Sequence, residues 1–192
     1  MRYFALTCLI LSSTTLSSQD LKISLKNGDS LEVQAKVQLE RIINKHEDAL
    51  APWLFTREVA IDKSAIPFSH PVLTLNCNYL KHDSKQLANF LHEQFHWLVA
   101  TMPAEEKAAI EDFRKIFLEV PVGGSKGARD EHSTYLHLIV CDLELQSMSK
   151  IVGEPTARQI LAEWKHYTWI YDKVLRDKRI REINSKHGFL ID

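Results

Sequence analysis

Residues 92–96 read HEQFH, and they stand in the middle of the apolar run LANFLHEQFHWLVA. The run has the composition of a buried helix, yet His92, Glu93 and His96 carry polar groups into it. An isolated polar group moved from water into apolar surroundings costs a few kcal/mol unless it finds a partner. We therefore expect a helix that packs on a core while its polar groups share a ligand or a hydrogen-bond partner.

The spacing of the two histidines indicates what that ligand is. Residues four apart on a helix project from the same face, so His92 and His96 can offer ring nitrogens to one ion at about 2.0–2.1 Å. Glu93 stands beside that face, where its carboxylate can remove a proton from water. The pattern predicts Zn²⁺ as cofactor, His92 and His96 as metal ligands, and Glu93 as the general base. The other interpretation is that backbone or carboxylate partners satisfy both histidines.

The H-E-x-x-H pattern of His92, Glu93 and His96 resembles that of the zincin metallopeptidases. The resemblance covers roughly a quarter of the chain. It implies an α+β, mostly helical fold with a small twisted sheet and an active-site helix. It also implies that the segment HPVLTLN, residues 70–76, is an edge strand that binds an extended substrate. No H-x-x-G-x-x-H continuation follows His96, so a third ligand must come from elsewhere.

Three residues of the segment RDEHSTYLHLIVCDLE compete for the place of the third ligand. We prefer His137, because imidazole binds a metal as a neutral group and this one lies among aliphatic residues. Gluzincins take the third ligand from a Glu early in the following helix. Glu131, in the stretch GARDEH, resembles that residue. Glu144 lies about 10.5 Å along the helix from His137, so only one of these two can bind the ion directly. Glu144 would then orient one of the two motif histidines, and Tyr135 or His137 is a candidate for supporting an oxyanion.

The N-terminal stretch MRYFALTCLILSSTTLSSQD has the form of a secretory signal peptide. Arg2 is followed by an apolar run that is too short to span a bilayer as a helix, and small hydroxyl residues come next. We expect residues 1–19 to be a signal peptide and residues 20–192 to form a single zincin-like domain, secreted or periplasmic. The other interpretation is a frayed or buried N-terminal helix.

Charge and cysteine content narrow the possible partners. The net charge is −1, from 24 Lys and Arg against 25 Asp and Glu, so there is no basic excess to bind nucleic acid. We find no membrane span in the mature chain, and the sequence does not fix the oligomeric state. Cys77 and Cys141 lie beside aliphatic residues, which favours two free thiols over a disulfide.

Periodicity and turn residues predict the elements around the motif. The short β-branched runs VAID and HPVLTLN indicate strands. The turn signal Asn27-Gly28-Asp29 predicts a junction between two short strands. Helices are expected over residues 31–50, 85–100, 103–120 and 130–150, with one long helix from Pro155 onward.

Together these patterns predict an exported zinc-dependent hydrolase, in the first place a peptidase that acts on a peptide or protein. The alternative is a non-catalytic exported binding protein that keeps the zincin scaffold and holds a structural zinc or none. Four protein ligands would favour the alternative, whereas three ligands and an open position would favour hydrolysis. Specificity depends on the shape of the pocket, so the sequence does not identify the substrate.

Overall fold

Residues 21–191 are described by a computed structural model, and the expected signal peptide lies outside them. They form a mostly helical α+β fold around one hydrophobic core, and this fold class confirms the prediction. No helix within residues 21–191 combines the length and the apolar character needed to cross a membrane.

A small parallel sheet lies in the N-terminal part of the chain. Strands β1 (Lys22–Leu25), β2 (Glu58–Ile61) and β3 (Leu73–Leu75) pair in that order, and β2 and β3 confirm the two predicted strands. Parallel neighbours need a crossover connection, which α1 (Ser30–Lys45) supplies between β1 and β2. The short helices α2 (Glu47–Leu50) and η2 (Ala51–Trp53) follow, so the helix predicted over residues 31–50 is present with a break.

The strand-to-strand turn predicted at residues 27–29 is wrong, because this turn leads from β1 into α1. Asp29 caps the helix by accepting hydrogen bonds from the main-chain N–H groups of Leu31 and Glu32. The buried Glu32 carboxylate accepts the N–H groups of Asn27 and Gly28 at 2.7 and 2.8 Å. An Asp followed three residues later by a Glu is a helix-start signal, and here it outweighs the Asn-Gly turn signal.

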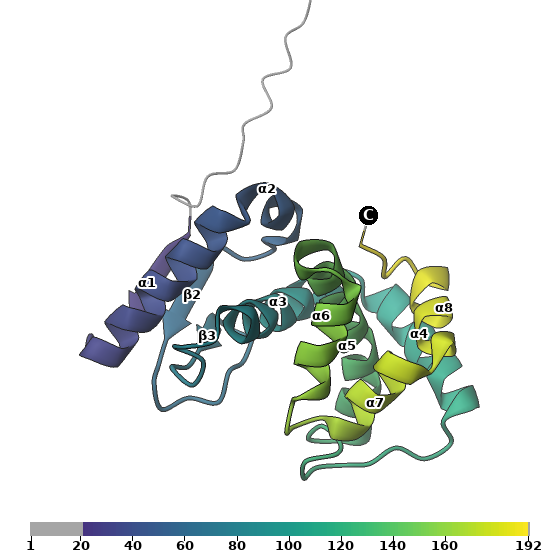
Figure 1. The fold of residues 1–192 in the computed structure, drawn as a ribbon. Helices are drawn as coiled ribbons and strands as arrows, with labels where there is room; N and C mark the ends of the chain where they lie inside the picture. The colour runs from purple at the N-terminus through teal and green to yellow at the C-terminus, as the bar shows by residue number, and fades with distance from the viewer. Residues whose placement is uncertain (1–20, 192) are drawn as a thin grey trace, which may run out of the picture.

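Helix α3 (Asp83–Ala100) carries the HEQFH motif and lies between the sheet and the helices of the C-terminal part (Figure 1). One face of the helix packs on the core, where Phe95 is fully buried. Gln94 fastens the helix to the preceding loop, because its Oε1 accepts the main-chain N–H groups of residues 55 and 56 at 2.9 and 3.0 Å. The histidines of the motif are therefore displayed by a helix that is anchored on both sides.

Helix α5 (Glu131–Val152) is the centre of the helical part, and α4 (Pro103–Ile116) packs beside it. Helix α3 also packs on α5, and so do the three helices that follow α5 in the chain (Figure 1). Asp130 caps α5 by accepting the N–H of Ser133 at 2.6 Å. The helix ends at Gly153, whose positive φ of 83° needs a residue without a Cβ. Both helices confirm their predictions.

The single long helix predicted from Pro155 is wrong, because three shorter helices occupy this region. They are α6 (Glu154–Ala162), α7 (Thr168–Arg176) and α8 (Lys178–Lys186). The chain turns at Tyr167, which has a left-handed backbone, and again at Asp177, which caps α8. Several short helices on one core produce the same apolar spacing as one long helix, so periodicity does not locate the breaks.

We predict that Leu138→Ala, in the centre of α5, lowers the free energy of unfolding by about 2–5 kcal/mol. Leu138 is fully buried, so the change removes packed methyl groups and leaves a cavity. Leu118→Ala is the matched control, because Leu118 is 87% exposed and its loss should change the stability by less than about 0.5 kcal/mol. Urea unfolding measures both, and equal effects of the two variants would contradict the central place of α5.

Candidate metal centre

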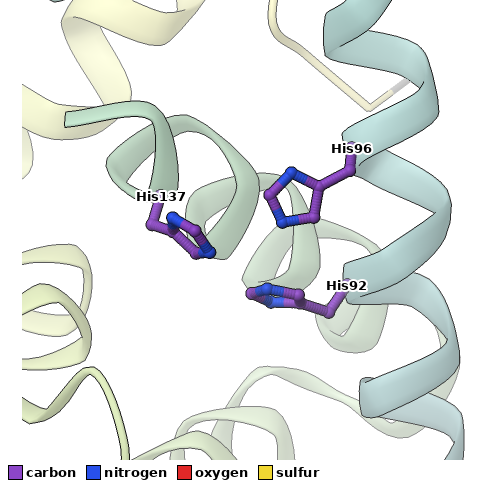
Figure 2. Close-up of side chains that lie close together, drawn as sticks. All are labelled: His92, His96 and His137. Carbon is purple, nitrogen blue, oxygen red and sulfur yellow. The ribbon is translucent and has the colours of Figure 1, made fainter. Parts of the chain in front are cut away.

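Three histidines from two helices meet at one point. Figure 2 shows His92 and His96 leaving the same face of α3, with His137 facing them from α5. One nitrogen from each ring lies within 4.8 Å of the others. Nitrogens bound to one tetrahedral zinc lie roughly 3.3 Å apart, so a bound ion would draw the rings closer together. The fold thus assembles the three residues that the sequence analysis names as ligands.

Hydrogen bonds determine which nitrogen two of these rings can offer. His92 Nδ1 lies 3.0 Å from Oε2 of Glu144, and His137 Nδ1 lies 2.6 Å from the carbonyl oxygen of Ser133. Each ring donates through Nδ1 and keeps Nε2 free for an ion. Metal-binding histidines are usually fixed in this way, with a carboxylate or carbonyl on the other nitrogen.

Glu144 holds His92 in place from behind. Its carboxylate is fully buried and also accepts the hydroxyl of Tyr171 at 2.8 Å and Nε1–H of Trp164 at 3.4 Å. A buried carboxylate requires such donors, since burial without them is strongly unfavourable. The predicted contact between Glu144 and a motif histidine is therefore present, and its partner is His92.

Two other residues named from the sequence lie away from the histidines. Glu131 is exposed, and its carboxylate lies 3.3 Å from the guanidinium of Arg114. Tyr135 is buried and donates its hydroxyl to the carbonyl of Phe117 at 2.6 Å, so the expectation that it supports an oxyanion is wrong. Residues two apart on a helix point in different directions, and Tyr135 therefore faces away from the side that carries His137.

Burial keeps two of the three imidazoles neutral. It lowers the pKa of His137 to about 3 and that of His96 well below its usual range, and the charge of nearby His92 acts in the same direction. Burial also lowers the pKa of His92, but hydrogen bonds with Cys141 and Glu144 outweigh it and hold this pKa well above its usual range. Histidines bind a metal in the deprotonated form, so His96 and His137 are already in the required state.

Glu93 lies beside the three histidines and is 5% exposed. Burial raises the pKa of Glu93 to about 7. The charge of His92 lowers this pKa, and the charge of Glu144 raises it. A carboxyl group with a pKa near neutrality can take up and release protons under physiological conditions. A pKa of about 7 is compatible with the general-base role that the sequence predicts for Glu93.

A cavity of about 810 Å³ opens over these groups, a volume typical of ligand-binding sites. Residues 65–70, which we call segment 65–70, form part of its wall. The segment is held by Nε1–H of Trp97, which donates to the carbonyl of Ser69 at 2.9 Å, and the Trp97 ring stacks on His70 at 4.2 Å. The candidate centre is therefore reached through a preformed cavity.

The prediction that the segment HPVLTLN has a free edge is wrong at Thr74, the middle residue of β3. Thr74 pairs with β2 on one side, and on the other side it exchanges two main-chain hydrogen bonds with Phe68, at 3.1 and 2.8 Å. Segment 65–70 therefore covers this part of β3 and faces the cavity in its place.

A second group of possible ligands lies behind His92. The thiol of Cys141 and the carboxylate of Glu144 each lie within 4.8 Å of a nitrogen of His92 and of each other. Cys141 and Cys77 are free thiols, as predicted. Cys141 and Glu144 are fully buried, and Glu144 already bonds to Nδ1 of His92, so an ion would have to replace this hydrogen bond to bind here. We therefore assign the candidate metal centre to the three histidines that line the cavity.

Comparison with protein-family models, curated proteins and solved structures gives no match. Among residues 21–191, no fourth His, Cys, Asp or Glu completes the set of three histidines. A metal held there would keep a position open toward the cavity.

We predict that His137→Ala lowers the affinity for Zn²⁺ by far more than 100-fold, because it removes one of three ligands. Glu131→Ala is the matched control and should leave the affinity unchanged, since its carboxylate pairs with Arg114 at the surface. Competition with a chromophoric chelator measures both. If Glu131→Ala lost zinc while His137→Ala bound it with the parental affinity, the assignment of His137 would be wrong. Glu131 would then be the third ligand, as in an ordinary gluzincin.

We predict a smaller effect, a 10- to 100-fold loss of zinc affinity, for Glu144→Gln, because Glu144 orients His92 without reaching the ion. Glu119→Gln, at an exposed position, is the control and should not change the affinity. The same chelator competition applies. A loss as large as that of His137→Ala would mean that Glu144 is itself a ligand.

Proposed function

We propose that this protein is a zinc-dependent hydrolase, and specifically a zincin-like peptidase. The observation that carries the proposal is the shared cavity in which Glu93 stands beside three convergent histidines. Imidazole suits Zn²⁺, Cu²⁺, Fe²⁺ and Ni²⁺. The H-E-x-x-H spacing of His92, Glu93 and His96 favours zinc among these, because a base next to the ligands is what metal-assisted hydrolysis needs.

The chemistry divides between the ion and the chain. Zinc supplies a Lewis acid that polarises a carbonyl and makes nearby water more acidic. Glu93 takes the proton from the attacking water and returns it to the leaving amine, a role that its raised pKa suits. Glu144 keeps the His92 ring oriented, because its carboxylate accepts a hydrogen bond from Nδ1 and so leaves the other ring nitrogen for the ion.

The form of the cavity wall supports a polypeptide substrate. Ile66 and Phe68 of segment 65–70 are 86% and 44% exposed, although both are large apolar side chains. Exposed apolar groups at the edge of a cavity are typical of a ligand-binding surface. An extended chain with apolar side chains would cover them. We further propose that the protein acts after export, a proposal that the signal-peptide-like residues 1–19 support.

The alternative, a non-catalytic binding protein with a structural zinc or none, receives less support. Structural zinc sites are closed by four protein ligands. The histidine set contains three, and a cavity lies next to them.

We predict that Glu93→Gln keeps zinc at the parental level and lowers the rate of peptide cleavage by about 10²- to 10⁴-fold. The three imidazoles remain in this variant, but the amide cannot accept the proton from water. A broad peptide library, with zinc content determined on the same mature sample, measures both properties.

Glu105→Gln is the matched control, because Glu105 is exposed on α4 and its loss should not change the rate. Parental cleavage by Glu93→Gln would contradict the role proposed for this residue. A parent protein that holds one zinc and cleaves no member of the library would favour the binding-protein alternative.

A further inference from the structure

The corner between α6 and α7 is strained, and the strain falls on a tyrosine. Tyr167 is the one residue other than glycine in the described part of the chain with a positive φ, at φ 52° and ψ 32°. This left-handed conformation is unfavourable for a side chain with a Cβ. Such residues persist where the surrounding structure imposes them, and they gather at functional sites.

Main-chain hydrogen bonds from a separate loop impose the conformation of the corner. The N–H of Thr168 donates to the carbonyl of Ser125 at 2.9 Å, and the N–H of Trp169 donates to the carbonyl of Lys126 at 3.3 Å. These N–H groups belong to the first turn of α7, which has no partners for them within the helix. The loop thus fixes where α7 begins and where Tyr167 is placed.

The same loop, residues 121–128, is tied to the helix that carries His137. Thr134, in the first turn of α5, donates its hydroxyl to the carbonyl of Pro121 and accepts the N–H of Ala128, both at 2.9 Å. One loop therefore connects the start of α5 to the corner at Tyr167. The relative position of Tyr167 and His137 is set by these contacts.

The Tyr167 ring lies against the metal centre. Its centroid is 4.3 Å from that of His137 and 6.1 Å from that of His92, and it lines the cavity. Its hydroxyl has no hydrogen-bond partner among residues 21–191 and is not one of the buried unpaired atoms. The hydroxyls of Tyr135 and Tyr171, by contrast, bond to a carbonyl and a carboxylate. The Tyr167 hydroxyl is therefore neither paired nor sealed in the core, and the ring that carries it lines the cavity beside His137 and His92.

We propose that Tyr167 is a catalytic residue that donates a hydrogen bond to an anionic oxygen of a ligand at the metal centre. During hydrolysis this oxygen is the carbonyl oxygen of the substrate. It receives the electron pair of the C=O bond as the oxygen of water bonds to carbon and Glu93 takes the proton. A fixed donor aimed at developing negative charge is among the strongest contributions to catalysis. The assignment of the reaction rests on the proposed function, whereas the binding of an anionic oxygen requires only the metal.

The direct test uses Tyr167→Phe, which keeps the ring against the imidazoles and removes only the hydroxyl. Parent and variant are loaded with Co²⁺, and the visible absorption of cobalt follows a titration with acetohydroxamic acid, which offers an anionic oxygen. The variant should bind acetohydroxamate about 10- to 100-fold more weakly, as expected for the loss of one hydrogen bond to a charged group. Thermal unfolding of the two proteins should be alike, which separates this role from a structural one.

Tyr79→Phe is the matched control, because Tyr79 lines the same cavity while its ring packs on Trp164 at 5.2 Å. Its affinity for acetohydroxamate should equal that of the parent. Equal affinity of parent and Tyr167→Phe, with cobalt bound to both, overturns the proposal and leaves the proposed function standing. A parent that binds no cobalt overturns the metal centre and this proposal with it. Where peptide cleavage is measurable, Tyr167→Phe should lower kcat by about 10²- to 10³-fold with little change in KM.

Discussion

The hydrogen bond between Glu144 and His92 is the contact on which the candidate site depends. It joins α3 to α5 in the interior, where Glu144 is fully buried and His92 is 7% exposed. Two further donors, Tyr171 of α7 and Trp164 of the α6–α7 corner, complete the surroundings of the carboxylate. Three separate parts of the chain are therefore held against α3 through one buried group. Removing a single member of such a network leaves a buried charge or donor without a partner, which is costly in a low-dielectric interior.

This network explains how the fold carries polar groups inside an apolar helix. The imidazoles of His92, His96 and His137 pack against one another beside the cavity. The Nδ1 atoms of His92 and His137 also have hydrogen-bond partners in the protein. The opposite face of α3 is apolar and packs on the core. The helix is thus amphipathic in an unusual sense, because its polar face lines an internal cavity. A metal ion at this place would satisfy the nitrogens that the protein leaves free.

Much of the site could be predicted because its residues follow helical spacing. His92 and His96 are four apart, and His137 and Glu144 share a polar stripe in an otherwise apolar helix. Tyr167 could not be found in this way, because its position depends on hydrogen bonds to Ser125 and Lys126, about 40 residues earlier. A glycine or asparagine would have signalled a left-handed corner, but a tyrosine does not. The pairing of Phe68 with Thr74 was missed for a similar reason, since Phe68 stands in a proline-containing loop that carries no strand pattern.

The coordination of a bound zinc ion tests the proposed metal centre most directly. X-ray absorption spectroscopy at the zinc edge distinguishes nitrogen ligands at about 2.0–2.1 Å from a sulfur ligand at about 2.3 Å. If His92, His96 and His137 hold the ion, the protein loaded with one equivalent of zinc should show three imidazole nitrogens and one light oxygen ligand, with no sulfur. A sulfur contribution would place the metal on Cys141, Glu144 and His92 instead and would contradict the three-histidine centre.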